Sequence, residues 1–147
     1  MPQDPVSSLV PSSAAPSAAA VPPVVPGYDV VRLLGRGGMG IVWEAVEHRL
    51  DRRVALKVCN GDVTPARVAR LWGEACLAAK IGHPGVVPVH DFGYTVDERP
   101  FYTMELVPGT ELRAVLEDGP LPPQRALDLG LQIADAVGAA HAHGILH

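Results

Sequence analysis

The chain has 147 residues, of which 48% are hydrophobic and 19% are charged, so it is long enough to bury one core and too apolar to be disordered throughout. Its formal net charge of −4 gives no reason to expect nucleic acid or an anionic membrane as a partner. Two cysteines, Cys59 and Cys76, are too few for a disulfide framework and match no metal-ligand spacing, which favours reduced thiols in a cytoplasmic protein.

Residues 1–26 form a low-complexity segment in which most positions are Pro, Ala, Ser or Val and Asp4 carries the charge. The many prolines oppose both helix and sheet, because proline lacks a backbone N–H and fixes its own φ angle. We therefore predict a disordered, partly polyproline-like leader. The folded part is predicted to begin at Gly27.

Three glycines, Gly35, Gly37 and Gly40, lie between two predicted strands, residues 28–34 and 41–47. The second of these segments is rich in β-branched and aromatic residues and partly alternating, which is typical of a strand. Glycine lets the backbone come close to a ligand because it has no Cβ. A loop of this kind can also turn its N–H groups toward phosphate oxygens. The pattern therefore indicates a site for the phosphates of a nucleotide.

The residues after the glycines distinguish three kinds of phosphate-binding loop. A Walker loop ends in Gly-Lys-Ser/Thr, whereas Gly40 is followed by Ile41 and Val42. A dinucleotide-binding fingerprint opens a helix, and the strand predicted here argues against a dinucleotide-dependent oxidoreductase. A third predicted strand, residues 53–59, contains Val-Ala-Leu-Lys and ends this run at Lys57, whose ammonium group can supply a point charge for phosphates.

The order Gly-x-Gly-x-x-Gly-x-Val and then Val-Ala-Leu-Lys resembles the glycine-rich loop and lysine strand of protein kinases. The wording Leu-Gly-Arg-Gly-Gly-Met-Gly is similar to that of bacterial, eukaryotic-like (Hanks-type) serine/threonine kinases. The resemblance implies an α+β fold, with an N-lobe of five antiparallel strands and one helix followed by the first helices of a C-lobe. It implies an N-lobe over residues 27–105, a hinge over 106–109 and the start of a C-lobe over 110–147.

A helix is predicted after the third strand, because Thr64 can serve as its N-cap and Pro65 as its first residue. Gly82 and Pro84 are expected to end it. One face of this helix is apolar, and it consists of residues at helical spacing: Val68, Leu71, Trp72, Ala75 and Ala79.

Glu74 lies in this helix, and the kinase resemblance implies that its carboxylate pairs with Lys57. The alternative is an ordinary solvated glutamate on a helix surface. Gly73 stands beside it and lowers the helix propensity by up to about 1 kcal/mol relative to alanine.

Residues 86–92 and 100–105 are predicted to form the fourth and fifth strands. Asp91, Phe92 and Gly93 spell the metal-binding motif of kinases, but they come before the place of the catalytic loop. We interpret them as the end of the fourth strand and assign no metal to them.

The fifth strand and the residues after it resemble the hinge of a kinase. By that resemblance Met104 lies at the back of an adenine pocket, the backbone of residues 105–107 bonds the adenine edge, and Val42 and Ala55 form the roof. The resemblance implies that the residues that contact ATP are Leu34, Gly35, Arg36, Gly37, Gly38, Met39, Gly40, Ile41, Val42, Ala55, Lys57, Met104, Glu105 and Val107.

A short helix over residues 111–116 and a long helix from residue 122 or 123 to 143 are predicted next. Apolar residues spread nearly all round the long helix, which predicts that it is buried, like the central helix of a kinase C-lobe. The resemblance implies that His147 is the first residue of the His-Arg-Asp motif. His141 and His143 join it in a histidine cluster that lacks the acidic or cysteine ligands typical of a metal site.

The catalytic aspartate and the Mg²⁺ ligands of the family are expected after His147. We therefore expect a partial kinase domain, truncated at the start of the catalytic loop, and no kinase activity from the 147-residue polypeptide alone. The resemblance implies ATP and a protein substrate as partners, with phosphate transfer to Ser or Thr. A catalytically inactive nucleotide-binding or scaffold protein is the alternative. No apolar run long enough for a transmembrane helix is expected.

Overall fold

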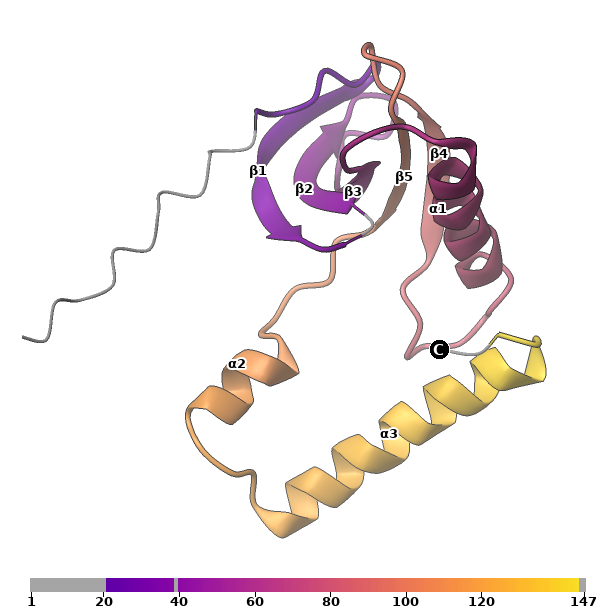
Figure 1. The fold of residues 1–147 in the computed structure, drawn as a ribbon. Coiled ribbons are helices and arrows are strands. Elements are labelled where there is room, and N and C mark those ends of the chain that lie inside the picture. Colours follow the sequence, from indigo (N-terminus) through magenta and orange to yellow (C-terminus); the bar gives the residue numbers. More distant parts are fainter. Residues whose placement is uncertain (1–20, 39, 146–147) are drawn as a thin grey trace, which may run out of the picture.

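The computed structural model describes residues 21–38 and 40–145 (Figure 1). Its strands and helices, in chain order, are β1 (Tyr28–Arg36), β2 (Gly40–Glu47), β3 (Arg52–Cys59), α1 (Pro65–Ala78), β4 (Val89–Tyr94), β5 (Pro100–Glu105), α2 (Leu112–Glu117) and α3 (Pro123–Ala142). Within the described residues the strands form one antiparallel sheet in the order β1-β2-β3-β5-β4. The predicted five-stranded sheet with one helix, followed by further helices, is confirmed.

One face of the sheet carries the main hydrophobic core. In the paired strands β2 and β3, Trp43 stands opposite Leu56 and Ala45 opposite Val54, and all four are buried. Successive side chains of a strand point to opposite faces, so the residues next to these in each strand face the other side. Lys57 follows Leu56 in β3, and the site described below is therefore built on the face opposite this core.

The folded part begins before Gly27, earlier than the sequence predicted. Val25 is buried in the same core and pairs with Tyr28, and the backbone oxygen of Val24 accepts a hydrogen bond from the Val96 N–H at 2.9 Å. Composition could not reveal this, because a valine beside prolines looks the same whether or not it packs against a distant loop. Residues 1–20 lie outside the described residues.

Helix α1 begins as predicted, with the Thr64 hydroxyl accepting from the Arg67 N–H at 3.4 Å. It ends at Ala78 rather than continuing toward Gly82. The N–H groups of Lys80 and Ile81 bond to oxygens three residues earlier, at 3.1 and 3.2 Å, so the last turn tightens before the glycine is reached.

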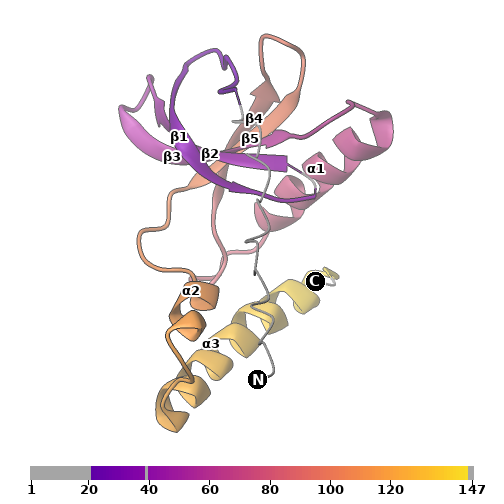
Figure 2. The same ribbon diagram turned by 60° about the vertical axis from the view of Figure 1, so that its left-hand side comes forward.

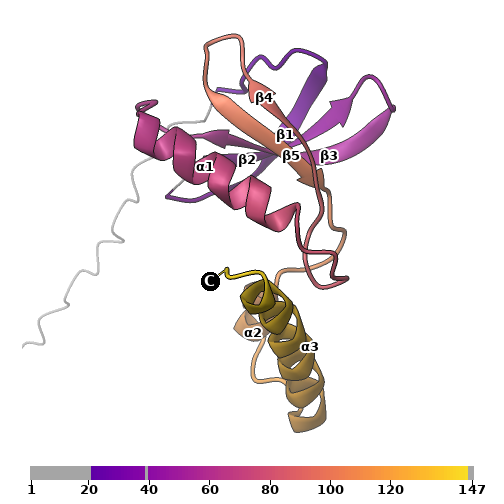
Figure 3. The ribbon, with the colours of Figure 1, turned by 90° about the vertical axis from the view of Figure 1, so that its right-hand side faces the viewer.

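Two sets of contacts hold α1 against the sheet, across which it runs in Figure 3. Leu71 is buried in a cluster with Tyr102 of β5. Trp72 lies against the rings of Phe92 and Tyr94 on β4, at centroid distances of 5.9 and 5.5 Å. Helix α1 is thus fixed both over the middle of the sheet and at its edge.

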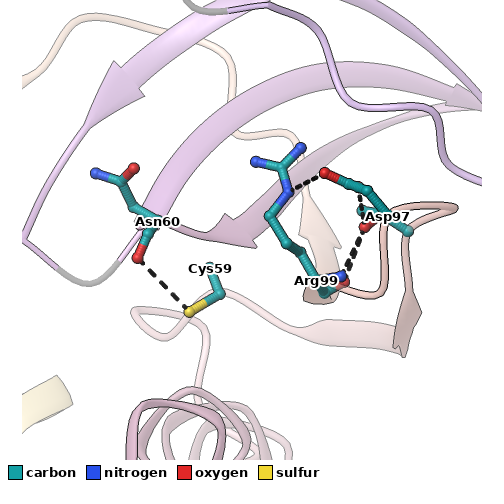
Figure 4. A network of polar contacts seen from close by, with 5 residues as sticks. Cys59, Asn60, Asp97 and Arg99 are labelled. Carbon is teal, nitrogen blue, oxygen red and sulfur yellow. Dashed lines mark hydrogen bonds and ion pairs between the residues drawn. The ribbon is translucent and has the colours of Figure 1, made fainter. Parts of the chain in front are cut away.

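Strand β4 begins at Val89 instead of residue 86. Pro88 has no N–H to give to a strand ladder, although its oxygen accepts from the Glu105 N–H at 3.0 Å. At its other end the strand continues to Tyr94, so Asp91 and the two residues after it lie within β4, one residue short of its end. The turn to β5 is braced by a bond of 2.7 Å from Arg99 Nε to the Asp97 carboxylate (Figure 4).

Helices α2 and α3 follow the sheet and lie apart from it (Figure 2). The apolar residues that the long helix would bury under a C-lobe are exposed in the described part of the chain: Leu127, Leu131 and Ile133 are 58%, 61% and 50% exposed. An apolar pattern shows what a helix is able to bury, but it does not supply the partner surface. None of the described helices is long and apolar enough to cross a membrane.

Candidate functional site

Strand register brings three side chains into one row above the second face of the sheet. Val42 of β2 stands opposite Lys57 of β3, and Lys57 stands opposite Tyr102 of β5. Helix α1 crosses over this row, and its residue Glu74 contacts Lys57. Lys57 Nζ and Glu74 Oε1 are 2.5 Å apart, although the two residues are 17 positions apart in the chain.

The ion pair is partly shielded from water, since the Lys57 and Glu74 side chains are 15% and 34% exposed. Burial raises the pKa of Glu74, but the hydrogen bonds from Lys57 and Tyr102 outweigh burial and hold it below its usual value of 4.5. Glu74 is therefore a carboxylate at neutral pH. Burial and the hydrogen bond to Glu74 raise the pKa of Tyr102, so its phenol stays protonated and able to donate.

A cavity of about 380 Å³ lies between this face of the sheet and the segment that follows β5. Much of its lining was predicted from the sequence, namely Leu34, Gly35, Val42, Ala55, Met104, Glu105 and Val107. The rest of the lining was not named among the site residues: Val87, Leu106, Pro108, Gly109, Thr110 and Glu111.

None of the other predicted ATP contacts that the structure describes lines the cavity. Met39 lies outside the described residues, and the Ile41 side chain packs against the core on the opposite face. The remainder, which lie in the glycine loop or beside the cavity, are Arg36, Gly37, Gly38, Gly40 and Lys57. Lys57 lies close to the cavity because Val42, which stands opposite it in the strand pairing, lines the cavity.

The glycines of the loop have different local roles. A Cβ on Gly40 would lie 2.6 Å from the Val58 oxygen, so this glycine allows β2 and β3 to approach. Cβ atoms on Gly35 and Gly38 would meet no described atom within 4 Å. No described atom therefore stands close to the backbone at these two positions, which leaves room for a ligand such as a phosphate.

Some of these residues could have been found from the sequence, and others could not. Leu106, Pro108 and Gly109 lie within the predicted hinge, so the hinge range already pointed to them. Val87 lies in a loop that reaches the cavity only through the tertiary fold. Tyr102 was taken simply as part of a strand, and its contact with Glu74 spans 28 positions.

The residues present fit ATP better than a metal ion. The cavity is apolar at Val42, Ala55 and Met104, offers hinge backbone groups, and lies beside a lysine. Within residues 21–38 and 40–145, no group of three or more His, Cys, Asp or Glu side chains could hold a metal.

Comparison with known proteins agrees with this geometry. The model of the protein kinase domain matches residues 28–147. The serine/threonine-protein kinases PknD and PknH of Mycobacterium tuberculosis are each 45% identical to the chain over 123 residues. Each match covers 82% of this chain, but only 18% of PknD and 20% of PknH. PknA of the same organism is 41% identical over 127 residues, covering 82% of this chain and 30% of its own.

Solved structures give the same result. The kinase domain of PknI from Mycobacterium tuberculosis matches with a TM-score of 0.66 and 31% identity, over 84% of this chain and 51% of that domain. The chain thus spans less than a third of these curated relatives and about half of a solved kinase domain. The chain belongs to the protein kinase family, and it forms part of a kinase domain related to those of the bacterial Hanks-type serine/threonine kinases.

Proposed function

We propose that this chain is the ATP-binding part of a serine/threonine protein kinase, which transfers phosphate from ATP to a Ser or Thr hydroxyl of a protein substrate. The observation that carries the proposal is the 2.5 Å contact between Lys57 and Glu74 beside a cavity of about 380 Å³. The names of the relatives, all serine/threonine-protein kinases, support the same reaction.

Each part of the site has a role in this proposal. The adenine ring lies between Val42 and Ala55 on one side and the hinge on the other, with Met104 at the back. The backbone of Glu105 and the residues after it bonds the adenine edge. Lys57 contacts the phosphates, and Glu74 holds the lysine in place. Phosphate transfer depends mainly on such positioning and on stabilising charge.

Kinases use Mg²⁺ with ATP, and none of the described residues is offered as its ligand. We expect the protein as its gene encodes it to bind ATP and to transfer its phosphate. Separate assays of nucleotide binding and of phosphate transfer test the two steps.

Lys57→Ala in the gene-encoded protein tests the role of the lysine. We expect kcat/KM for ATP to fall by about 100-fold or more, because one charge that stabilises the transferring phosphate is lost. Lys80→Ala is the matched control. Lys80 is exposed in the turn after α1, does not line the cavity and is not part of the ion pair.

Radioactive phosphate transfer to a generic protein substrate, with circular dichroism to check folding, measures the outcome. Equal activity of the Lys57→Ala protein and the unchanged protein would contradict the role of Lys57. ATP binding without any phosphate transfer by the gene-encoded protein would favour an inactive nucleotide-binding or scaffold protein.

A further inference from the structure

We infer that Tyr102 is a positioning residue for the Lys57–Glu74 pair. Its phenol O–H donates a hydrogen bond of 2.7 Å to Glu74 Oε1, the same oxygen that contacts Lys57 Nζ. The inference rests on the proposed function, since it concerns the pair that holds the ATP phosphates. Tyr102 does not line the cavity, and in this role it acts through Glu74.

The fold holds the phenol in place more firmly than it holds the lysine. Tyr102 is 4% exposed and is packed with Cys59, Leu71 and Ala75 between the sheet and α1. Its side chain has two rotatable bonds and a rigid ring, so its hydroxyl has few alternative positions. Lysine has a flexible four-carbon stem. The phenol therefore provides the fixed reference point for the carboxylate.

The Glu74 carboxylate is held by two donors, the Tyr102 phenol and the Lys57 ammonium group. Glu74 Oε2 is buried and has no hydrogen-bond partner among the described residues, so the group is held through Oε1. Lys57 Nζ also lies 5.6 Å from the centre of the Tyr102 ring, which adds a favourable contact between cation and ring face. Without the phenol O–H, only the flexible Lys57 side chain would hold Glu74 Oε1. The glutamate could then no longer fix the position of the lysine.

The alternative is that the Tyr102 ring only fills space under α1. Phenylalanine retains that ring, so Tyr102→Phe removes the O–H and little else. Tyr28→Phe is a matched control: Tyr28 also sits in a strand and donates to a carboxylate, Asp91 Oδ2 at 3.3 Å, but it packs against the core on the opposite face of the sheet.

The first measurement is the titration of Glu74 by carbon-13 NMR of labelled glutamate carboxyls in the gene-encoded protein, with Glu74→Gln used to assign the signal. Tyr102→Phe is expected to move the Glu74 titration to higher pH, because the ionised carboxylate loses a donor. Tyr28→Phe is expected to leave it unchanged. An unchanged titration in Tyr102→Phe would overturn the inference, whether or not the protein shows activity.

The second measurement is kinetic. Tyr102→Phe is expected to lower kcat/KM for ATP about tenfold, as for loss of a hydrogen bond to a charged group, with the acidic limb of the pH profile moved upward. In a Glu74→Gln background the same change is expected to add little, because both act through one carboxylate. An equal loss in that background would show a packing role and overturn the inference. If the unchanged protein transfers no phosphate, the proposed function fails, and the titration still decides the role of Tyr102.

Discussion

At the scale of single residues, the glycines of the loop show that one motif combines two physical requirements. Gly40 is needed by the protein itself, since its missing Cβ leaves room for the Val58 oxygen. Gly35 and Gly38 face open space and are free to serve a ligand. From the sequence all three were expected to contact the ligand, and the packing adds a structural requirement at Gly40 alone.

Gly40→Ala is expected to destabilise the fold by about 1–3 kcal/mol, because a methyl group 2.6 Å from a backbone oxygen forces β2 and β3 apart. Gly38→Ala is the control and is expected to leave stability nearly unchanged. Denaturant unfolding, followed by circular dichroism, measures both. Equal midpoints for the two variants would show that the close approach of β2 and β3 tolerates a methyl group.

At the scale of elements, α1 determines where Glu74 lies, and its position depends on contacts with the middle of the sheet and with one edge. Leu71 anchors it over β3 and β5, and Trp72 anchors it on the edge strand β4. Gly73 lies between Trp72 and Glu74 and weakens the helix locally. Tertiary contacts therefore do more than helix propensity to place the glutamate.

Trp72→Ala is expected to cost about 2 kcal/mol of stability, less than the roughly 3–5 kcal/mol of a fully buried tryptophan because Trp72 is only partly buried. It is also expected to raise KM for ATP, since α1 loses its anchor on β4. Thermal unfolding and ATP kinetics of Trp72→Ala and the ring-preserving Trp72→Phe measure these effects. Matching losses in both variants would argue against anchoring by ring contact.

At the scale of the whole molecule, the sheet with α1 and the helices α2 and α3 meet along a narrow joint. His83 Nε2 lies 3.1 Å from Asp135 on α3, and a Cβ on Gly85 would lie 2.9 Å from the Ala136 side chain. A cavity of about 790 Å³ separates α1 from α3 next to this joint. The relative placement of the two parts thus depends on a few residues before β4.

Gly85→Ala is expected to push α3 away from the joint and to lower stability by about 1 kcal/mol. Amide hydrogen exchange is expected to quicken in the second half of α3 and to stay unchanged in β2 and β3. Gly82→Ala, whose Cβ would meet no described atom within 4 Å, is the matched control. Unchanged exchange in α3 of the Gly85→Ala protein would contradict this view of the joint.

Several features were determined by the sequence itself. The Thr64 cap and Pro65 start a helix, as predicted. The Val-Ala-Leu-Lys run lies in strand β3, Arg52–Cys59, which matches the predicted strand over residues 53–59. The fifth strand has the predicted bounds, Pro100–Glu105. These features depend on neighbouring residues, because caps, proline and side-chain alternation act within a few positions of the chain.

Other features were decided by the tertiary structure. The contact of Tyr102 with Glu74, the approach of Val87 to the cavity and the exposure of Leu131 each depend on elements that are distant in the chain. Strand register and helix placement bring such residues together, and no local pattern encodes which partner they meet. For this reason the sequence alone indicated the nucleotide-binding motif and its lysine, whereas only the folded chain decided how the glutamate beside that lysine is held.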